Sequence, residues 1–111
     1  MKRDYKLFID DIRKSINQIE YYMKNISEKQ LKNDLKIQDA IIRRLEIIGE
    51  ATKNIPRALK EKNRQVPWFD MSQFRDFITH SYFELSIMTL WKTIKIKLPL
   101  IKKAMSKIAL I

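Results

Sequence analysis

The sequence predicts an all-α protein, an up-and-down bundle of four to five helices. Apolar residues recur at three- and four-residue steps through most of the 111 residues, and no stretch keeps the alternation of a β-strand. The chain also has one glycine, Gly49, and three prolines, Pro56, Pro67 and Pro99, which is too few for a sheet protein with many tight turns. A chain of this length is expected to form a single domain, residues 1–111.

The first helix is expected to have roughly twenty residues, because its apolar residues form one continuous stripe between polar ones. That stripe comprises Tyr5, Phe8, Ile9, Ile12, Ile16, Ile19 and Met23. Asn25 is expected to end the helix. Ser27 and Gln30 then have the spacing of a capping box, which predicts a new helix start after Ser27.

A second long helix is predicted by the apolar residues from Leu35 to Ala51. Gly49 lies inside it, where glycine lowers helix stability, so another helix is expected to pass close to this residue. Pro56 is expected to stop the helix or to open a short one from Pro56 to Glu61.

The second half of the chain predicts two further helical regions. Residues 66–69 are interpreted as a rigid apolar connector, and Asp70 as the N-cap of a helix that begins at Met71 and ends near Ser81. The expected buried stripe of this helix is Phe74, Phe77 and Ile78. The last region runs from about Leu85 to Ile108, and Pro99 either breaks it, kinks it or opens a separate final helix.

Trp68, Trp91 and the pair Tyr21-Tyr22 are expected to pack in the interior, because their neighbours are largely apolar. Tryptophan also stacks on nucleic-acid bases, which is the alternative for Trp68 and Trp91.

The composition excludes several classes of site. There is no cysteine, which excludes disulfides, thiol catalysis and cysteine-based zinc sites. With a single histidine and no paired acidic signature, neither a metal site nor a cofactor is expected. No apolar run is long enough to cross a bilayer, and the charged N-terminal residues are unlike a signal peptide, so a cytoplasmic protein with no membrane association is expected.

The net charge of +10 is concentrated towards the end of the chain, since no acidic residue follows Glu84. The lysines beyond that point are Lys92, Lys95, Lys97, Lys102, Lys103 and Lys107. They form either a solvated face that keeps the protein soluble or an electrostatic surface for RNA or for an acidic protein partner.

The only histidine, His80, lies five residues after Arg75 and two residues before Tyr82. Imidazole exchanges protons near neutral pH, and the guanidinium fork binds phosphate oxygens, so the three residues indicate chemistry on a phosphodiester. On one straight helix Arg75 and His80 would point ~140° apart. The two side chains would come together if the helix loosens near Thr79, if the long arginine side chain reaches round the helix, or if a two-fold axis joins two copies in one cleft.

A dimer also suits the chemistry of RNA cleavage by the ribose 2′-hydroxyl. That reaction needs a base for the hydroxyl and an acid for the leaving oxygen, and two protomers supply two imidazoles. Glu46 and Glu50, one helical turn apart, are expected to pair with Arg43 and Lys53, although Glu50 is also a candidate to support Arg75.

Arg75-x4-His80-x-Tyr82 resembles the Arg-x4-His-x-Tyr motif of HEPN-domain ribonuclease toxins, the HepT group in particular. The segment Asp39–Thr52 is similar to the second-helix signature of that group, Val66-Pro67-Trp68 to its Ile-Pro-Trp connector, and Leu98-Pro99 to the start of its last helix. Asp76 matches the usual Asn or Asp after the motif arginine. Gln73-Phe74 replaces the usual Gly-Met, which predicts altered local packing.

The resemblance implies an all-helical homodimer with a composite cleft that acts as a metal-independent endoribonuclease. Arg75 and His80 would be the catalytic pair, with Asp76 and Glu50 expected to support them. It also implies a toxin of a type II or type VII toxin–antitoxin system. The partner would be a minimal nucleotidyltransferase antitoxin of the MntA type, which transfers AMP to Tyr82 and so silences the toxin.

The alternative is a non-catalytic helical dimer that binds a nucleotidyltransferase. The presence of all three motif residues, Arg75, His80 and Tyr82, disfavours this alternative.

Overall fold

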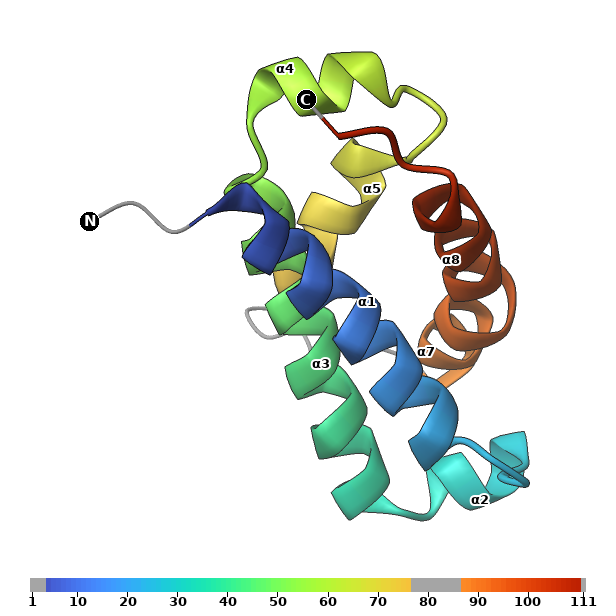
Figure 1. Cartoon of the computed structure of the whole chain (residues 1–111). Coiled ribbons are helices and arrows are strands. Elements are labelled where there is room, and N and C mark those ends of the chain that lie inside the picture. Colours follow the sequence, from blue (N-terminus) through green and yellow to red (C-terminus); the bar gives the residue numbers. More distant parts are fainter. Residues whose placement is uncertain (1–3, 77–86, 111) are drawn as a thin grey trace.

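The computed structural model describes residues 4–76 and 87–110, and every regular element within these ranges is helical (Figure 1). The all-α prediction is therefore confirmed. Two long helices, α1 (Tyr5–Tyr22) and α3 (Leu35–Lys53), run antiparallel and pack side by side along much of their length (Figure 1). The other elements are arranged around this pair.

The N-terminal elements begin and end largely as predicted. The Asp4 side chain accepts a hydrogen bond from the Lys6 N–H (2.9 Å) and caps α1, which has 18 residues. Asn25 follows the helix with a φ of 61°, a left-handed conformation that asparagine tolerates and that reverses the chain. The predicted capping box is present, because Gln30 N–H donates to Ser27 Oγ (3.1 Å) and Ser27 N–H donates to Gln30 Oε1 (2.8 Å).

The short helix α2 (Glu28–Lys32) follows this box, and a second carboxylate cap then starts α3. Asp34 accepts a hydrogen bond from the Ile37 N–H at 3.0 Å. After α3, Pro56 precedes the short helix α4 (Arg57–Lys62), in agreement with the second of the two roles predicted for that proline.

The prediction of a connector over residues 66–69 is wrong for residues 68–69, which are helical. The prediction that Asp70 is an N-cap is also wrong. Helix α5 (Trp68–Ser72) already begins directly after Pro67, and Asp70 lies in its first turn. The reason is burial, since Trp68 and Met71 are three residues apart and both enter the core from one helix face. The Trp68 indole also donates to the Asn63 carbonyl at 3.0 Å.

The 3₁₀ turn η1 (Gln73–Arg75) continues α5 and buries Phe74, as predicted. The predictions for Phe77, Ile78 and Ser81 lie outside the described residues.

The last helical region contains Pro99 without a break. Helix α7 (Ile87–Lys92) passes into a π-helical turn, η2 (Thr93–Lys97), and then into α8 (Leu98–Ser106). Pro99 lies in the first turn of α8. A proline ring clashes with the carbonyl four residues earlier in an α-helix, and the wider π turn before Pro99 relieves that clash. Leu85, the predicted start, lies outside the described residues.

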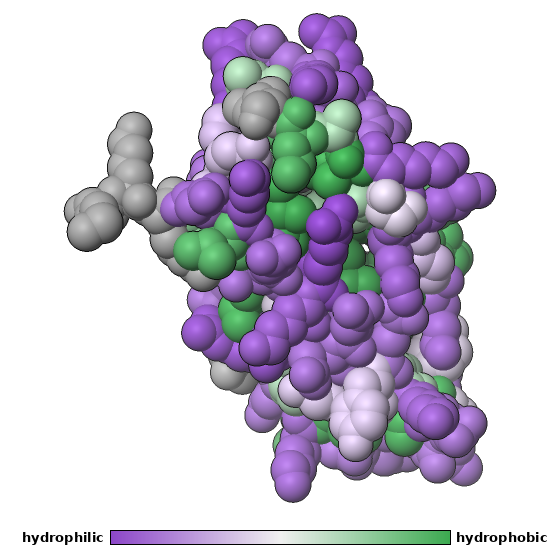
Figure 2. Space-filling view, in the orientation of Figure 1, coloured by the Kyte–Doolittle hydropathy of each residue, from purple (hydrophilic) through white to green (hydrophobic). Residues whose placement is uncertain are grey.

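Side chains from all the larger elements meet in one apolar core. Its fully buried members with the largest side chains are Ile9, Ile12, Ile16, Ile19, Leu31, Ile41, Leu45, Ile48, Leu59, Met71, Leu90 and Leu98. The surface seen in Figure 2 is mostly hydrophilic, with apolar residues showing between the polar side chains in its upper half. Among the described helices, none combines the length and apolarity that crossing a bilayer requires.

The predicted packing of the tyrosine pair holds only in part. Tyr22 is half-buried against the core, whereas Tyr21 is 74% exposed and only touches the edge of the Tyr22 ring.

Polar contacts hold the C-terminal segment onto the rest of the fold. Arg13 of α1 donates through Nη2 to the Met105 carbonyl at 2.8 Å. Beyond α8 the chain crosses beside α4 (Figure 1). There the buried Asn63 donates through Nδ2 to the carbonyls of Leu59 (2.9 Å) and Ala109 (2.7 Å), and its Oδ1 accepts from the Ala109 N–H (2.7 Å).

We expect Asn63→Ala to lower the free energy of unfolding by about 2–3 kcal/mol, because it leaves buried backbone groups without partners. Urea unfolding followed by circular dichroism at one fixed protein concentration measures the loss. Asn17→Ala on the exposed face of α1 is the matched control and should be close to neutral. A loss no larger than that of the control would show that the C-terminal segment does not depend on Asn63.

Candidate active site

The structure describes part of the predicted motif. Arg75 is the last residue of η1 and is exposed, and Asp76 follows it and is half-buried. His80 and Tyr82 lie outside the described residues, so their predicted roles stay predictions. The described part of the site therefore consists of Arg75, Asp76 and the residues that contact Arg75.

Arg75 lies directly against Gly49 of α3. A Cβ atom placed on Gly49 would be 2.5 Å from the Arg75 backbone nitrogen, 2.8 Å from its Cβ and 3.1 Å from its Cα. Real Cβ atoms essentially never approach other atoms as closely as the first two distances, and the third is tighter than nine in ten real Cβ contacts. The prediction that another helix passes close to Gly49 is confirmed, and the residue that passes there is the motif arginine.

Glu50, the next residue of α3, contacts the side chain of the same arginine. Its Oε1 lies 3.5 Å from Arg75 Nε, and the two side chains are about half exposed, at 54% and 46%. The sequence spacing also predicted Lys53 as a partner for Glu50, but the ion pair forms with Arg75. Glu46, one turn earlier, pairs with Arg43 at 2.8 Å as expected.

This arrangement suits binding of a phosphate by Arg75. The pair with Glu50 runs through Nε, so this contact does not occupy the edge of the guanidinium formed by Nη1 and Nη2. That edge has the geometry to donate two parallel hydrogen bonds to phosphate oxygens. The half-exposed side chain can do so without a large rearrangement. Within residues 4–76 and 87–110, no group of three or more His, Asp or Glu side chains could hold a metal ion.

The chain matches the family model described as "Ribonuclease HepT-like" over residues 12–108. It is 41% identical over 108 residues to a protein of Thermococcus cleftensis named "Probable ribonuclease HepT", an alignment that covers 97% of this chain and 98% of that relative. This chain belongs to the HepT-like ribonuclease family.

Other relatives carry related names. A Methanocaldococcus jannaschii protein named as a "Putative RNase" is 38% identical over 107 residues, which is 96% of this chain and 88% of that protein. A Caldanaerobacter subterraneus protein with the same kind of name is 37% identical over 86 residues, 78% of this chain and 77% of that protein. No solved structure matches the chain.

The basic surface of this HepT-like chain lies on its last helices. Of the six lysines after Glu84, all are exposed, and Lys102 pairs with Glu20 of α1 at 2.8 Å. The Lys95 ammonium lies 4.9 Å from the centre of the Trp91 ring, a cation–π contact. Trp91 is half-buried and packs against the core, and Trp68 is almost fully buried, so both tryptophans pack as predicted.

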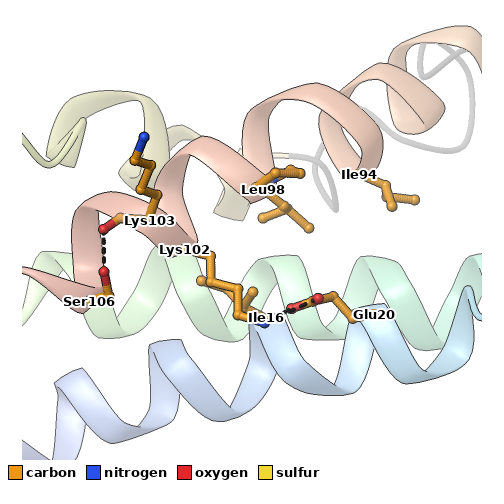
Figure 3. Close-up of a pocket in the computed structure, with 8 residues that line it drawn as sticks. Ile16, Glu20, Ile94, Leu98, Lys102, Lys103 and Ser106 are labelled. Atoms are coloured by element: carbon orange, nitrogen blue, oxygen red, sulfur yellow. Dashed lines mark hydrogen bonds and ion pairs between the residues drawn. The ribbon is translucent and has the colours of Figure 1, made fainter.

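A hollow of about 360 Å³ lies between α1 and the η2–α8 segment, remote in sequence from Arg75 (Figure 3). Ile16, Ile94 and Leu98 form its apolar part, and the Glu20–Lys102 ion pair joins its two sides (Figure 3). Neither Arg75 nor Glu50 lines it, so it is separate from the described part of the candidate site.

A second hollow of about 350 Å³ is lined by residues of α4, α5 and the connection between them. Phe69 lines it and is 75% exposed. Burial lowers the pKa of Lys60, which also lines this hollow, below its usual value. Arg75 is not among its lining residues either.

We expect Glu50→Gln to change the free energy of unfolding by less than about 1 kcal/mol, because ion pairs between half-exposed side chains contribute little to stability. Urea unfolding of the two proteins at equal concentration measures the difference. A loss as large as the one expected for Asn63→Ala would contradict this interpretation and make Glu50 a structural residue.

Proposed function

We propose that this protein is an endoribonuclease and the toxin of a type II or type VII toxin–antitoxin system. The observation that carries the proposal is the family match over residues 12–108, which includes the Arg75-x4-His80-x-Tyr82 motif. The placement of Arg75, exposed and paired with Glu50 through Nε rather than through the phosphate-binding edge, supports the ribonuclease part of the proposal independently.

In the proposed reaction, His80 of one protomer takes the proton of a ribose 2′-hydroxyl, and the 2′-oxygen attacks the adjacent phosphorus. The bond between phosphorus and the 5′-oxygen breaks, and the His80 imidazolium of the second protomer gives that oxygen a proton. The products carry a 2′,3′-cyclic phosphate and a 5′-hydroxyl. Arg75 binds the non-bridging phosphate oxygens and stabilises the charge that develops on them. Each proton is accounted for by a side chain, so the proposed reaction is metal-independent and needs no cofactor.

The reaction needs two imidazoles, which is the reason to propose a homodimer with a shared cleft. The basic surface of α7–α8 would attract the RNA backbone toward that cleft. Asp76 and Glu50 would support Arg75 from the two chain segments that meet at it.

We also propose that an MntA-type nucleotidyltransferase is the antitoxin and that it attaches AMP to Tyr82. Tyr82 follows His80 by two residues, so an adenylate there would border the same cleft. The added phosphodiester would occupy Arg75 and repel RNA, and its bulk would block the cleft. A helical dimer that only binds such a partner would need none of the three motif side chains.

We expect Arg75→Ala and His80→Ala each to lower the rate of RNA cleavage by at least about 100-fold while the protein stays folded, because each removes a group used in the transition state. Cleavage of total RNA in EDTA, circular dichroism and light scattering are measured on the same samples.

Lys36→Ala, an exposed lysine on the first turn of α3, is the control for loss of one positive charge. Wild-type cleavage by folded His80→Ala would contradict the catalytic assignment. A monomer at micromolar concentration would contradict the shared cleft.

We expect the neighbouring nucleotidyltransferase, with ATP and magnesium, to add AMP to Tyr82 and to stop cleavage. Intact mass and peptide mapping locate the modification, and cleavage is assayed beside it. Tyr82→Phe should still cleave RNA and should escape silencing, whereas Tyr21→Phe, an exposed tyrosine of α1, should be silenced like the wild type. AMP on another residue, or on Tyr82 without loss of activity, would show that the proposed switch is wrong.

A further inference from the structure

Two consecutive residues of α3 contact the motif arginine in different ways. Gly49 lies against the backbone of Arg75, and Glu50 pairs with its guanidinium. We propose that Gly49 and Glu50 are positioning residues for Arg75: Gly49 sets where its backbone lies, and Glu50 sets how its guanidinium points. The inference rests on the proposed ribonuclease function and adds to it the residues that place its phosphate-binding group.

The role of Gly49 follows from which atoms lie near it. The three atoms closest to a methyl group at this position would be the backbone nitrogen, Cα and Cβ of Arg75, none of which is the far end of a flexible side chain. These atoms cannot move unless η1 moves as a whole. Any residue larger than glycine at position 49 therefore displaces the start of the Arg75 side chain away from α3.

The role of Glu50 follows from the position of its carboxylate along the guanidinium. The contact is made at Nε, the nitrogen nearest the aliphatic part of the side chain. A carboxylate there favours the rotamers in which Nε faces α3, and the Nη1 and Nη2 edge then faces away from Glu50. Arginine has many rotamers, so restricting them before the substrate binds lowers the cost of ordering the side chain in the transition state.

The Glu50 carboxylate should also have an effect that a purely structural residue would not have. It is a negative charge within ion-pair distance of the group that binds phosphate, and so it repels RNA in the ground state. Removing the charge but keeping the shape, as in Glu50→Gln, should tighten RNA binding and slow cleavage. A variant that was merely less stable would not show a lower KM together with a lower kcat.

The first experiment compares steady-state cleavage of an oligoribonucleotide by the wild type, Gly49→Ala and Glu50→Gln. We expect Gly49→Ala to lower kcat by about tenfold or more, because small displacements of a positioning group are costly. We expect Glu50→Gln to lower kcat and also KM. Glu50→Asp, which keeps the charge, should retain the wild-type KM.

Glu46→Gln is the matched control, since Glu46 lies on the same helix one turn away and its ion pair is with Arg43. It makes the same change of charge without touching Arg75, and it should leave both constants close to those of the wild type. An equal effect of Glu46→Gln and Glu50→Gln, or wild-type kcat in folded Gly49→Ala, would overturn the proposal.

A second measurement does not depend on activity. In the wild type, the Nε–H nuclear magnetic resonance signal of Arg75, assigned with Arg75→Lys, should exchange with solvent more slowly than that of Arg64, an exposed arginine in the segment between α4 and α5. Glu50→Gln and Gly49→Ala should each speed the exchange at Arg75 alone. Unchanged exchange in both variants would overturn the proposal.

The two measurements separate this inference from the proposed function. If the wild type cleaves no RNA, the proposed function fails, and the exchange of Arg75 Nε–H alone decides whether Gly49 and Glu50 hold this arginine. If Gly49→Ala does not fold, the comparison of Glu50→Gln with Glu46→Gln decides it.

Discussion

The close contact between α3 and η1 at Gly49 is the constraint on which the candidate site depends. Glycine inside a helix costs about 1 kcal/mol relative to alanine, so α3 would be more stable alone with a larger residue there. The contact allows α5 and η1 to bury Trp68, Met71 and Phe74 against the core. Each such side chain contributes roughly 1.5–3 kcal/mol on burial, which outweighs the cost of the glycine.

The relative sizes of these free-energy contributions show which interactions hold the site together. The ion pair between Glu50 and Arg75 is half exposed and contributes about 1 kcal/mol at most, so it cannot hold η1 against α3. The apolar residues of α5 and η1 fix the crossing, the crossing puts Arg75 beside Gly49, and Glu50 then meets the guanidinium. The charged groups of the site can therefore serve the substrate while the fold depends on other residues.

Much of the fold could be predicted from the sequence, because local patterns determine most of its elements. The stripe of α1 and the Ser27–Gln30 capping box needed only residues close in the chain. The start of α5 was predicted wrongly because Asp70 is a good N-cap in isolation, whereas burial of Trp68 begins the helix earlier. Local sequence patterns also did not predict the π turn before Pro99. That turn accommodates the proline ring and at the same time keeps α7 and α8 packed as one continuous helical region, which depends on the whole fold.

For the candidate site, sequence patterns indicated the residue types but left their partners open. Gly49 indicated a nearby helix without indicating which one, because a contact between residues so far apart in the chain depends on the whole fold. Glu50 had two candidate partners at the level of the sequence, and helix spacing favoured Lys53. In the fold, η1 passes beside α3 and brings the Arg75 guanidinium to the Glu50 carboxylate. Glu50 therefore pairs with Arg75, through Nε, rather than with Lys53. The helical glycine and the acidic residue after it thus mark where the motif arginine crosses, but only the fold identifies Arg75 as their partner.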